Sequence, residues 1–209
     1  MIDVAIVGAG GFGKEVNLII QQLIKKGYNY RFLGFYDDKD LSHKLGRNYL
    51  GDVEELNKNS NPISVIIAIG DGMQRQILKE RITNPMINYL TLISPFAILN
   101  DIIKIGEGSI ICAGANLTTD IEIGDFVVVN LNATVGHDVV LNDYCSIMPG
   151  VNLAGEVNIG RAAFIGSGAT VLNGLTVGNK SILGAGAVLT KDLAAEQTAV
   201  GVPAKVVAS

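Results

Sequence analysis

Aliphatic residues recur at every sixth position through the second half of the chain. Counting from Ile105, fifteen successive positions hold Ile, Leu or Val without an insertion. These positions are Ile105, Ile111, Leu117, Ile123, Val129, Val135, Leu141, Ile147, Leu153, Ile159, Ile165, Val171, Val177, Leu183 and Leu189. The residue four places after each of them is small or β-branched in nearly every repeat. Since neither an α-helix nor an ordinary strand has a period of six, the pattern predicts a coil in which six residues form one side and one corner.

The N-terminal part of the chain carries a different pattern, in which short apolar runs alternate with a helical segment. It predicts strands over 2–7, 32–36 and 65–69 and a helix over 14–26. This alternation is typical of a small parallel α/β layer. The Gly-rich turn Gly8–Gly13 would let a phosphate approach the N-terminus of the helix. Asp37 and Asp38, after the second strand, can accept hydrogen bonds from a ribose or a base.

Composition removes several classes of protein. With 48% hydrophobic and 17% charged residues, the chain is too apolar to be disordered. The formal net charge is −4 and no basic run is longer than Lys25-Lys26, so the chain lacks the positive patch that nucleic acid or an anionic membrane requires. The two cysteines, Cys112 and Cys145, cannot form a disulfide framework.

Neither a leader nor a membrane span is expected. Met1-Ile2-Asp3-Val4 lacks the basic region of a signal peptide, and the longest apolar stretch, Ile63 to Ile69, is far short of the roughly 20 residues that cross a bilayer. We therefore expect a cytoplasmic protein. His43 and His137 are the only histidines, which leaves too few ligands for a zinc site of the three-histidine type, so we expect no metal.

The hexad repeat resembles that of the hexapeptide-repeat acyltransferases. Members of this family fold as a left-handed parallel β-helix with three hexads, or 18 residues, in each turn. The resemblance implies that residues 105–189 form between four and five such coils.

A Gly-rich α/β module joined to such a coil resembles one branch of that family. It is the group of bacterial nucleotide-amino-sugar N-acetyltransferases together with sialic acid O-acetyltransferases, and the likeness extends to the closing segment Gly201–Lys205. It implies a Rossmann-like module over 1–88 that binds a nucleotide sugar and a coil over 89–209 that binds acetyl-CoA. The expected function is acetyl transfer to a nucleotide-linked 4-amino-4,6-dideoxy-hexose in surface glycan biosynthesis.

The segment Gly136-His137-Asp138 matches the family's catalytic histidine followed by an acid. A base is needed because the attacking nitrogen or oxygen must lose a proton, and imidazole titrates near neutral pH. General-base catalysis of this kind contributes roughly 10²–10⁴ in rate. By the same resemblance, the backbone N–H of Gly155 would hold the thioester oxygen.

The resemblance also assigns binding residues. Acetyl-CoA contacts carry over to Ser146, Ser167 and Ala185. Nucleotide-sugar contacts carry over to Gly10, Gly11, Phe12, Asp37, Asp38 and Gly70. The chain departs from its relatives at Phe12 and Ser146, where family members often have histidine.

Members of this family assemble as cyclic trimers with active sites between neighbouring coils. Ile110, Val128 and Val140 are apolar at positions that the repeat directs outward, which favours a contact surface. We therefore expect a homotrimer in which His137 of one chain works with the segments of Ser167 and Ala185 of its neighbour.

Several alternatives remain open at this point. The Gly-rich turn alone also suggests a dinucleotide dehydrogenase, although no second domain for hydride transfer follows it. The acceptor could be the hydroxyl of a sialic acid, the donor could carry a longer acyl chain, and the module could bind a sugar nucleotide without catalysis. The sequence identifies neither the nucleotide nor the sugar.

Overall fold

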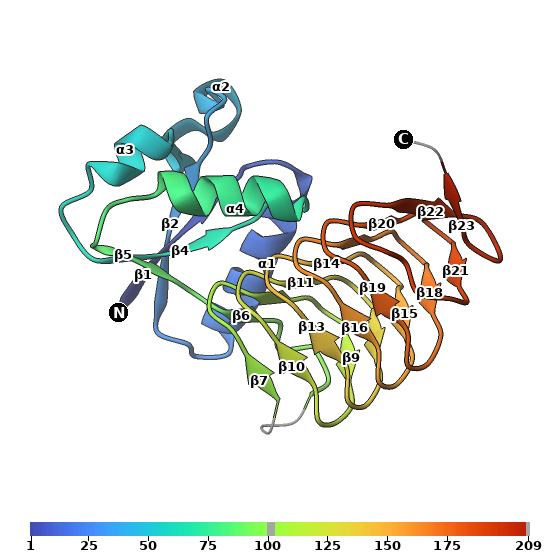
Figure 1. Ribbon diagram of the computed structural model, residues 1–209. Helices are drawn as coiled ribbons and strands as arrows, with labels where there is room; N and C mark the ends of the chain where they lie inside the picture. Colours follow the sequence, from blue (N-terminus) through green and yellow to red (C-terminus); the bar gives the residue numbers. More distant parts are fainter. Residues whose placement is uncertain (100–102, 208–209) are drawn as a thin grey trace.

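The computed structural model describes residues 1–99 and 103–207. It contains an α/β domain and a coil of short strands, and the later coils, orange to red in Figure 1, extend beyond the α/β domain. The predicted architecture, an α/β module followed by a three-sheet parallel β-helix, is confirmed. The last strand of the first domain ends at Tyr89 and the first strand of the coil begins at Leu92, next to the expected boundary at residue 88.

The N-terminal domain is built on a parallel sheet with the order β3-β2-β1-β4-β5. Its strands are β1 (Ile2–Val7), β2 (Tyr30–Tyr36), β3 (Tyr49–Gly51), β4 (Ile63–Ile67) and β5 (Ile87–Tyr89). Its helices are α1 (Gly11–Lys25), α2 (Ser42–Leu45), α3 (Val53–Asn57) and α4 (Gly72–Arg81), with a 3-10 turn η1 (Gly46–Asn48). The strand order reverses between β1 and β4, and ligands of open α/β sheets bind at the carboxyl ends of strands at such a point.

Helix α1 belongs to the α/β domain and packs between its sheet and the coil. Its buried residues Val16, Ile19, Ile20 and Leu23 recur at the spacing of one helical face. Gly13 begins this face, and a methyl group there would overlap the carbonyl oxygen of Gly8, so the turn after β1 needs glycine for close approach. The buried face packs on the sheet of the α/β domain and on the coil within one apolar cluster.

The coil consists of three parallel sheets. We call them the β11, β12 and β13 sheets, after three consecutive strands of which each belongs to a different sheet. The β11 sheet contains β6 (Leu92–Ile93), β8 (Ile110–Ile111), β11 (Val128–Val129), β14 (Ser146–Ile147), β17 (Phe164–Ile165), β20 (Ile182–Leu183), β22 (Thr198–Val200) and β23 (Lys205–Val207). The β12 sheet contains β9 (Asn116–Leu117), β12 (Thr134–Val135), β15 (Asn152–Leu153), β18 (Thr170–Val171) and β21 (Val188–Leu189). The β13 sheet contains β7 (Lys104–Ile105), β10 (Glu122–Ile123), β13 (Val140–Leu141), β16 (Asn158–Ile159) and β19 (Thr176–Val177).

The register of the coil follows the hexad repeat. Thr134 pairs with Asn152 and Glu122 pairs with Val140, so each strand lies beside the strand 18 residues later. From β7 to β21 the second residue of each strand is the aliphatic residue of the repeat, and from Ile111 to Leu189 these residues are buried together in one core. At the last coil the chain reverses, and β23 pairs antiparallel with β22.

The corners of the coil hold both small polar and aromatic residues in the left-handed conformation. Asp120, Asn132 and Asp138 adopt positive φ, as expected for Asn and Asp at turns, but Phe126 (φ 55°) and Tyr144 (φ 60°) do so as well. Phe126 and Tyr144 stack face to face with ring centroids 5.1 Å apart and are buried against the α/β domain. The contact between the domains therefore supports a backbone conformation that aromatic residues otherwise disfavour.

The outward apolar positions of the first coils face the α/β domain. Ile110 and Val128 are completely or almost completely buried, in the cluster that contains the inner face of α1. The expectation that they mark a contact with another chain was therefore wrong for these two residues, because their own chain covers them. Val140 remains partly exposed on the β13 sheet.

Candidate active site

His137 lies at the corner between the β12 and β13 sheets. Its Nδ1 is 2.7 Å from Oδ2 of Asp138, and more than half of each side chain is exposed. The positive φ of Asp138 (58°) belongs to the corner and places its carboxylate beside the ring. This hydrogen bond raises the pKa of His137 above its ordinary value. In the neutral ring it holds the proton on Nδ1, which leaves Nε2 free to accept one.

Gly155 occupies the same corner one coil later. A methyl group added there would overlap Nε2 of His137 and stand 2.6 Å from Cε1, so the imidazole lies directly against this glycine. The backbone N–H of Gly155 has no hydrogen-bond acceptor among residues 1–99 and 103–207. A proton acceptor and an unused backbone donor thus lie side by side on the surface of the coil.

Ser167 and Ala185 stack on one another at a different corner, between the β11 and β12 sheets. The N–H of Gly186, next to Ala185, donates to the carbonyl of Ser167 at 2.9 Å, and these two of the three predicted acetyl-CoA residues are exposed. The β12 sheet separates them from the corner of His137 within one chain.

Ser146 lies elsewhere. It is completely buried between the domains, where its hydroxyl donates to the carbonyl of Gly70 at 2.7 Å and accepts from Nη2 of Arg75 at 3.0 Å. This placement gives Ser146 a role in the domain contact and leaves it no surface for acetyl-CoA. Gly70, expected at the acceptor site, is bound into the same contact through its carbonyl oxygen.

A cavity of about 830 Å³ opens at the carboxyl ends of the strands of the α/β domain. Of the predicted acceptor residues, Gly10, Gly11, Asp37 and Asp38 line it, whereas Phe12 and Gly70 do not. Phe12 packs instead against the apolar cluster beneath α1. The sequence interpretation missed the cationic side chains that line the cavity. They come from three helices and the loop after β2 and form no motif: Lys14, Lys39, Lys44 and Arg81.

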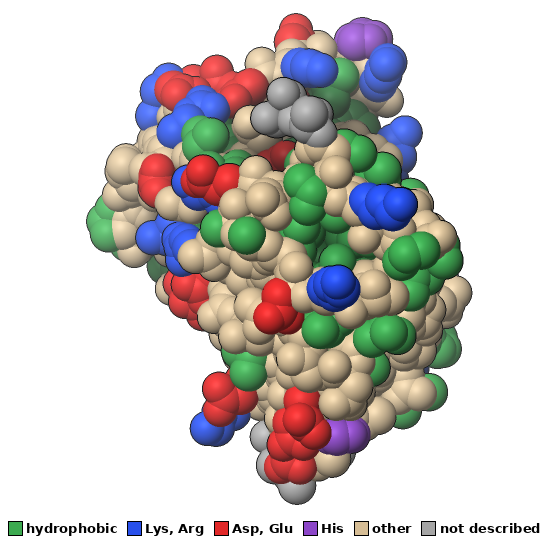
Figure 2. All heavy atoms as spheres, turned by 45° about the vertical axis from the view of Figure 1, so that its right-hand side comes forward, with side chains coloured by type: hydrophobic (Ala, Val, Ile, Leu, Met, Phe, Trp, Pro, Cys, Tyr) green, Lys and Arg blue, Asp and Glu red, His purple; other side chains and the backbone are tan. Residues whose placement is uncertain are grey.

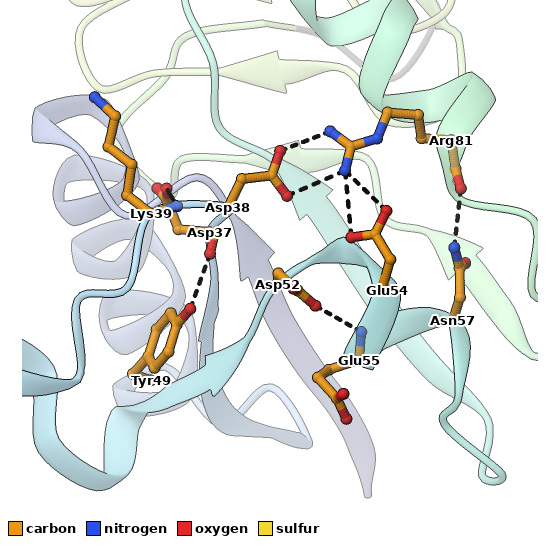
Figure 3. Close-up of polar contacts among 9 residues, drawn as sticks. All are labelled: Asp37, Asp38, Lys39, Tyr49, Asp52, Glu54, Glu55, Asn57 and Arg81. Atoms are coloured by element: carbon orange, nitrogen blue, oxygen red, sulfur yellow. Dashed lines mark hydrogen bonds and ion pairs between the residues drawn. The ribbon is translucent and has the colours of Figure 1, made fainter.

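Asp37 shapes the wall of this cavity. Its carboxylate accepts from the backbone N–H of Ala9 at 2.8 Å and of Lys39 at 2.9 Å. Its backbone carbonyl accepts from the hydroxyl of Tyr49 at 3.1 Å (Figure 3). Asp37 therefore ties the Gly-rich turn to the loop after β2.

Asp38 forms an ion-pair cluster with Arg81 and Glu54 at the edge of the same cavity. Nη1 of Arg81 is 2.6 Å from Oδ2 of Asp38, and Nη2 lies 3.1 Å from Oε1 of Glu54 (Figure 3). The guanidinium lowers the pKa of Asp38 and the two carboxylates raise the pKa of Arg81. Asp38 is thus already paired, which the sequence could not indicate because Arg81 is 43 residues away.

The structure contains neither a cluster of metal ligands nor a membrane-spanning helix among its described residues. Among the described residues, no group of three or more His, Cys, Asp or Glu side chains is arranged to hold a metal ion. The helices in the part of the chain that the structure covers are all too short or too polar to span a bilayer.

Comparison with known proteins covers both domains. Residues 3–82 match the family model of the PglD N-terminal domain, and residues 156–191 match that of the bacterial transferase hexapeptide. A curated UDP-N-acetylbacillosamine N-acetyltransferase of Bacillus subtilis is 36% identical over 117 residues. This match spans 54% of the chain and about half (52%) of that relative's length.

Two solved structures match the chain over nearly its whole length. One is the acetyltransferase domain of PglB from Neisseria gonorrhoeae in complex with acetyl coenzyme A, with 33% identity, a TM-score of 0.89 and coverage of 98% of each chain. The other is PerB from Caulobacter crescentus in complex with CoA and GDP-perosamine, with 32% identity, a TM-score of 0.86 and coverage of 99% of this chain and 97% of PerB. Together with the family matches on both domains, these likenesses confirm the resemblance seen in the hexads and the Gly-rich turn: the chain belongs to the PglD-type hexapeptide-repeat acetyltransferases, which use acetyl-CoA.

Proposed function

We propose that the protein transfers the acetyl group of acetyl-CoA to the amine of a nucleotide-linked amino sugar, of the 4-amino-4,6-dideoxy-hexose type, for surface glycan biosynthesis. The observation that carries the proposal is the contact between His137 and Gly155, because it joins a proton acceptor to an unused N–H donor. Both groups accelerate acetyl transfer to nitrogen, the first by accepting the proton of the amine and the second by stabilising the oxyanion. One of the relatives is a UDP-N-acetylbacillosamine N-acetyltransferase and another is in complex with GDP-perosamine, which supports the choice of acceptor.

The acceptor would bind in the cavity of the α/β domain. A diphosphate fits at the N-terminus of α1, where the first backbone N–H groups of the helix and the ammonium of Lys14 are available. The lining also contains Ile69, Leu78 and other apolar side chains that can cover the nucleoside. Asp37 contributes by holding the wall, and Asp38 contributes through its pairing with Arg81.

In the reaction, Nε2 of His137 takes the proton that the sugar amine loses as its nitrogen bonds to the thioester carbon. The N–H of Gly155 donates to the carbonyl oxygen while that oxygen carries negative charge. When the carbon–sulfur bond breaks, the imidazolium returns the proton to the sulfur of CoA. Asp138 holds the ring orientation and stabilises the imidazolium.

The active site would be completed by a neighbouring chain in a homotrimer. The α/β domain sits on the β11 sheet, and in a three-sided coil the corner of His137, between the other two sheets, lies opposite that face. An acceptor bound in the cavity of one chain is thus kept from the histidine of that chain by its own coil. Exposed apolar residues on the later coils, including Leu172 and Ile182, offer surface for the contact between chains. Figure 2 shows hydrophobic side chains at the surface on the side of the molecule that carries these coils.

Acetyl-CoA and nucleotide sugars are both made in the cytoplasm, which supports a cytoplasmic location. The proposal is tested by offering acetyl-CoA with UDP-, GDP- and dTDP-linked amino sugars and following the release of CoA. Release with CMP-sialic acid or free sialic acid alone would favour O-acetylation instead. No release with any acceptor, despite binding of a sugar nucleotide, would identify a non-catalytic module.

A further inference from the structure

Arg75 is buried between the two domains, and none of its hydrogen-bond partners within 1–99 and 103–207 is a carboxylate. Its side chain is 1% exposed and lies on the face of α4 that is turned to the coil. On the α/β side, Nη1 donates to the carbonyls of Ile69 at 2.7 Å and Gly70 at 3.0 Å. Burial lowers the pKa of Arg75 to about 10, so the guanidinium remains charged at neutral pH.

On the coil side, Arg75 binds two successive corners. Nε donates to the carbonyl of Phe126 at 3.0 Å, and Nη2 donates to the carbonyls of Tyr144 at 2.7 Å and Cys145 at 3.0 Å. The corner carbonyls of Phe126 and Tyr144 accept no other hydrogen bond within the described residues. One side chain thus satisfies backbone groups of both domains, using the planar fork of donors that lysine lacks.

The elements that Arg75 holds are walls of the acceptor cavity. Ile69, whose carbonyl it binds, lines the cavity, and Gln74, Ile77, Leu78 and Arg81 line it from the opposite side of α4. Helix α4 is therefore a wedge with the cavity on one side and the coil on the other. The hydrogen bonds between Arg75 and the coil therefore hold this wall of the cavity in place relative to the coil.

The contact lies at the level of the catalytic corner. Phe126 and Tyr144 occupy the same edge of the coil, one turn apart, and His137 lies between them along the chain. Only β13 separates the corner of His137 from that of Tyr144. In a cyclic trimer with its axis along the coils, each His137 lies at the same height. The contact of Arg75 places the cavity at the height of Tyr144 in the same chain. Because His137 lies near that height in every chain of such a trimer, the cavity is also level with His137 of the neighbouring chain.

We propose that Arg75 is a positioning residue for acetyl transfer, holding the acceptor cavity at the height of the coil at which the sugar amine meets the neighbour's His137. The inference rests on the proposed function and deepens it. A displacement of about 1 Å between reacting groups costs on the order of 10² in rate, although both substrates can still bind.

The test compares Arg75→Lys, Arg75→Met and Ser146→Ala in the full chain, with Gln76→Ala as the control on the same helix. Gln76 donates to Glu80 on the same helix, and among the described residues no hydrogen bond joins its side chain to the coil. We expect kcat for the nucleotide amino sugar to fall about 10- to 100-fold in Arg75→Lys and further in Arg75→Met. The Kd values for acetyl-CoA and for the matching nucleoside diphosphate should stay within about twofold of wild type.

Ser146→Ala removes only one of the contacts of Arg75 and tests the proposal even if Arg75→Met fails to fold. It should lower kcat by less than Arg75→Lys does. A lower melting temperature with unchanged kcat per folded molecule in Arg75→Lys and Ser146→Ala would overturn the proposal, because it would leave Arg75 a purely structural role. A raised Kd for the nucleoside diphosphate with unchanged kcat would also overturn it. If wild type transfers no acetyl group to any nucleotide amino sugar, the proposed function fails and this inference fails with it.

Discussion

The imidazole of His137 rests against Gly155, the residue 18 positions later, so closely that Gly155 has no room for a side chain. The φ of Gly155 is outside the left-handed region, so the backbone alone would accept alanine there. The space taken by the histidine explains the glycine.

Gly155→Ala is therefore expected to lower kcat by about 10²-fold while leaving the melting temperature nearly unchanged. The histidine is exposed and can swing away from the new methyl group at little cost in stability, but it then leaves the donor and the reacting nitrogen. Steady-state kinetics and thermal unfolding measure the two effects. In a His137→Ala background the same substitution should cost little more, since residues that act as a unit are not additive. Fully additive losses would contradict the shared role.

Asp138→Asn is expected to move the acid limb of the pH profile to lower pH. The carboxylate raises the pKa of His137, so its removal lets the ring lose its proton at a lower pH. The neutral ring is the active base, and activity therefore begins at a lower pH in the variant. The plateau at high pH should be lower as well, because a less basic imidazole is the weaker proton acceptor. A profile of kcat/KM that is identical in shape and height to wild type would exclude a role for Asp138.

Lys14→Ala is expected to raise the KM for the nucleotide sugar about 10- to 100-fold with little change in kcat, which is the usual range for one charged hydrogen bond. Lys14 lines the cavity in the first turn of α1, where a diphosphate would sit. The matched control is Lys25→Ala, in the last turn of the same helix. An equal rise in KM for both variants would indicate a general effect of charge.

Mixing two impaired variants is expected to restore activity if each site is shared between chains. One variant is His137→Ala and the other is Lys14→Glu, assayed far below its KM for the acceptor. Each mixed cyclic trimer has one junction in three with an intact cavity on one side and an intact histidine on the other, which is about a quarter of all junctions after random assortment. Co-expression with two different tags and purification through both isolates the mixed trimers. Activity no higher than that of the separate variants would place both groups of a site in one chain.

Gly72→Ala is expected to destabilise the protein by about 1–3 kcal/mol, which corresponds to a fall of roughly 2–4 °C in the melting temperature for each kcal/mol. A methyl group at Gly72 would overlap the carbonyl oxygen of Tyr144, where α4 presses on the coil. Gly70→Ala is the control, because a methyl group there meets no atom within 4 Å. Equal melting temperatures for both variants would show that the contact between α4 and the coil accommodates a methyl group at Gly72 at no cost in stability.

The sequence predicts the inside of the coil better than its outside. The hexad positions lie in the core as expected, because a period of six determines which residues point inward. What covers an outward residue depends on contacts between segments far apart in the chain. Ile110 and Ser146 are buried beneath the α/β domain for this reason, although the repeat alone indicates solvent or a partner.

The same reason explains the misses in the α/β domain. The Gly-rich turn indicates the cavity, since it is local, but Arg81 reaches Asp38 from another helix. The burial of Arg75 could be suspected only from its spacing, since it lies three residues after Gly72. These two residues form the buried face of α4. An arginine in a short helix otherwise predicts an exposed side chain.

Strand β23 ends the β11 sheet and runs antiparallel to the other strands of that sheet. A stack of parallel strands with two open ends could in principle grow, one molecule adding its first strand, β6, to the last strand of another. Because β23 runs opposite to β6, such an addition cannot continue the parallel register, and the next coil would meet the stack in the wrong orientation. The final hairpin thus acts against fibre formation in a fold whose repeating geometry would otherwise permit it.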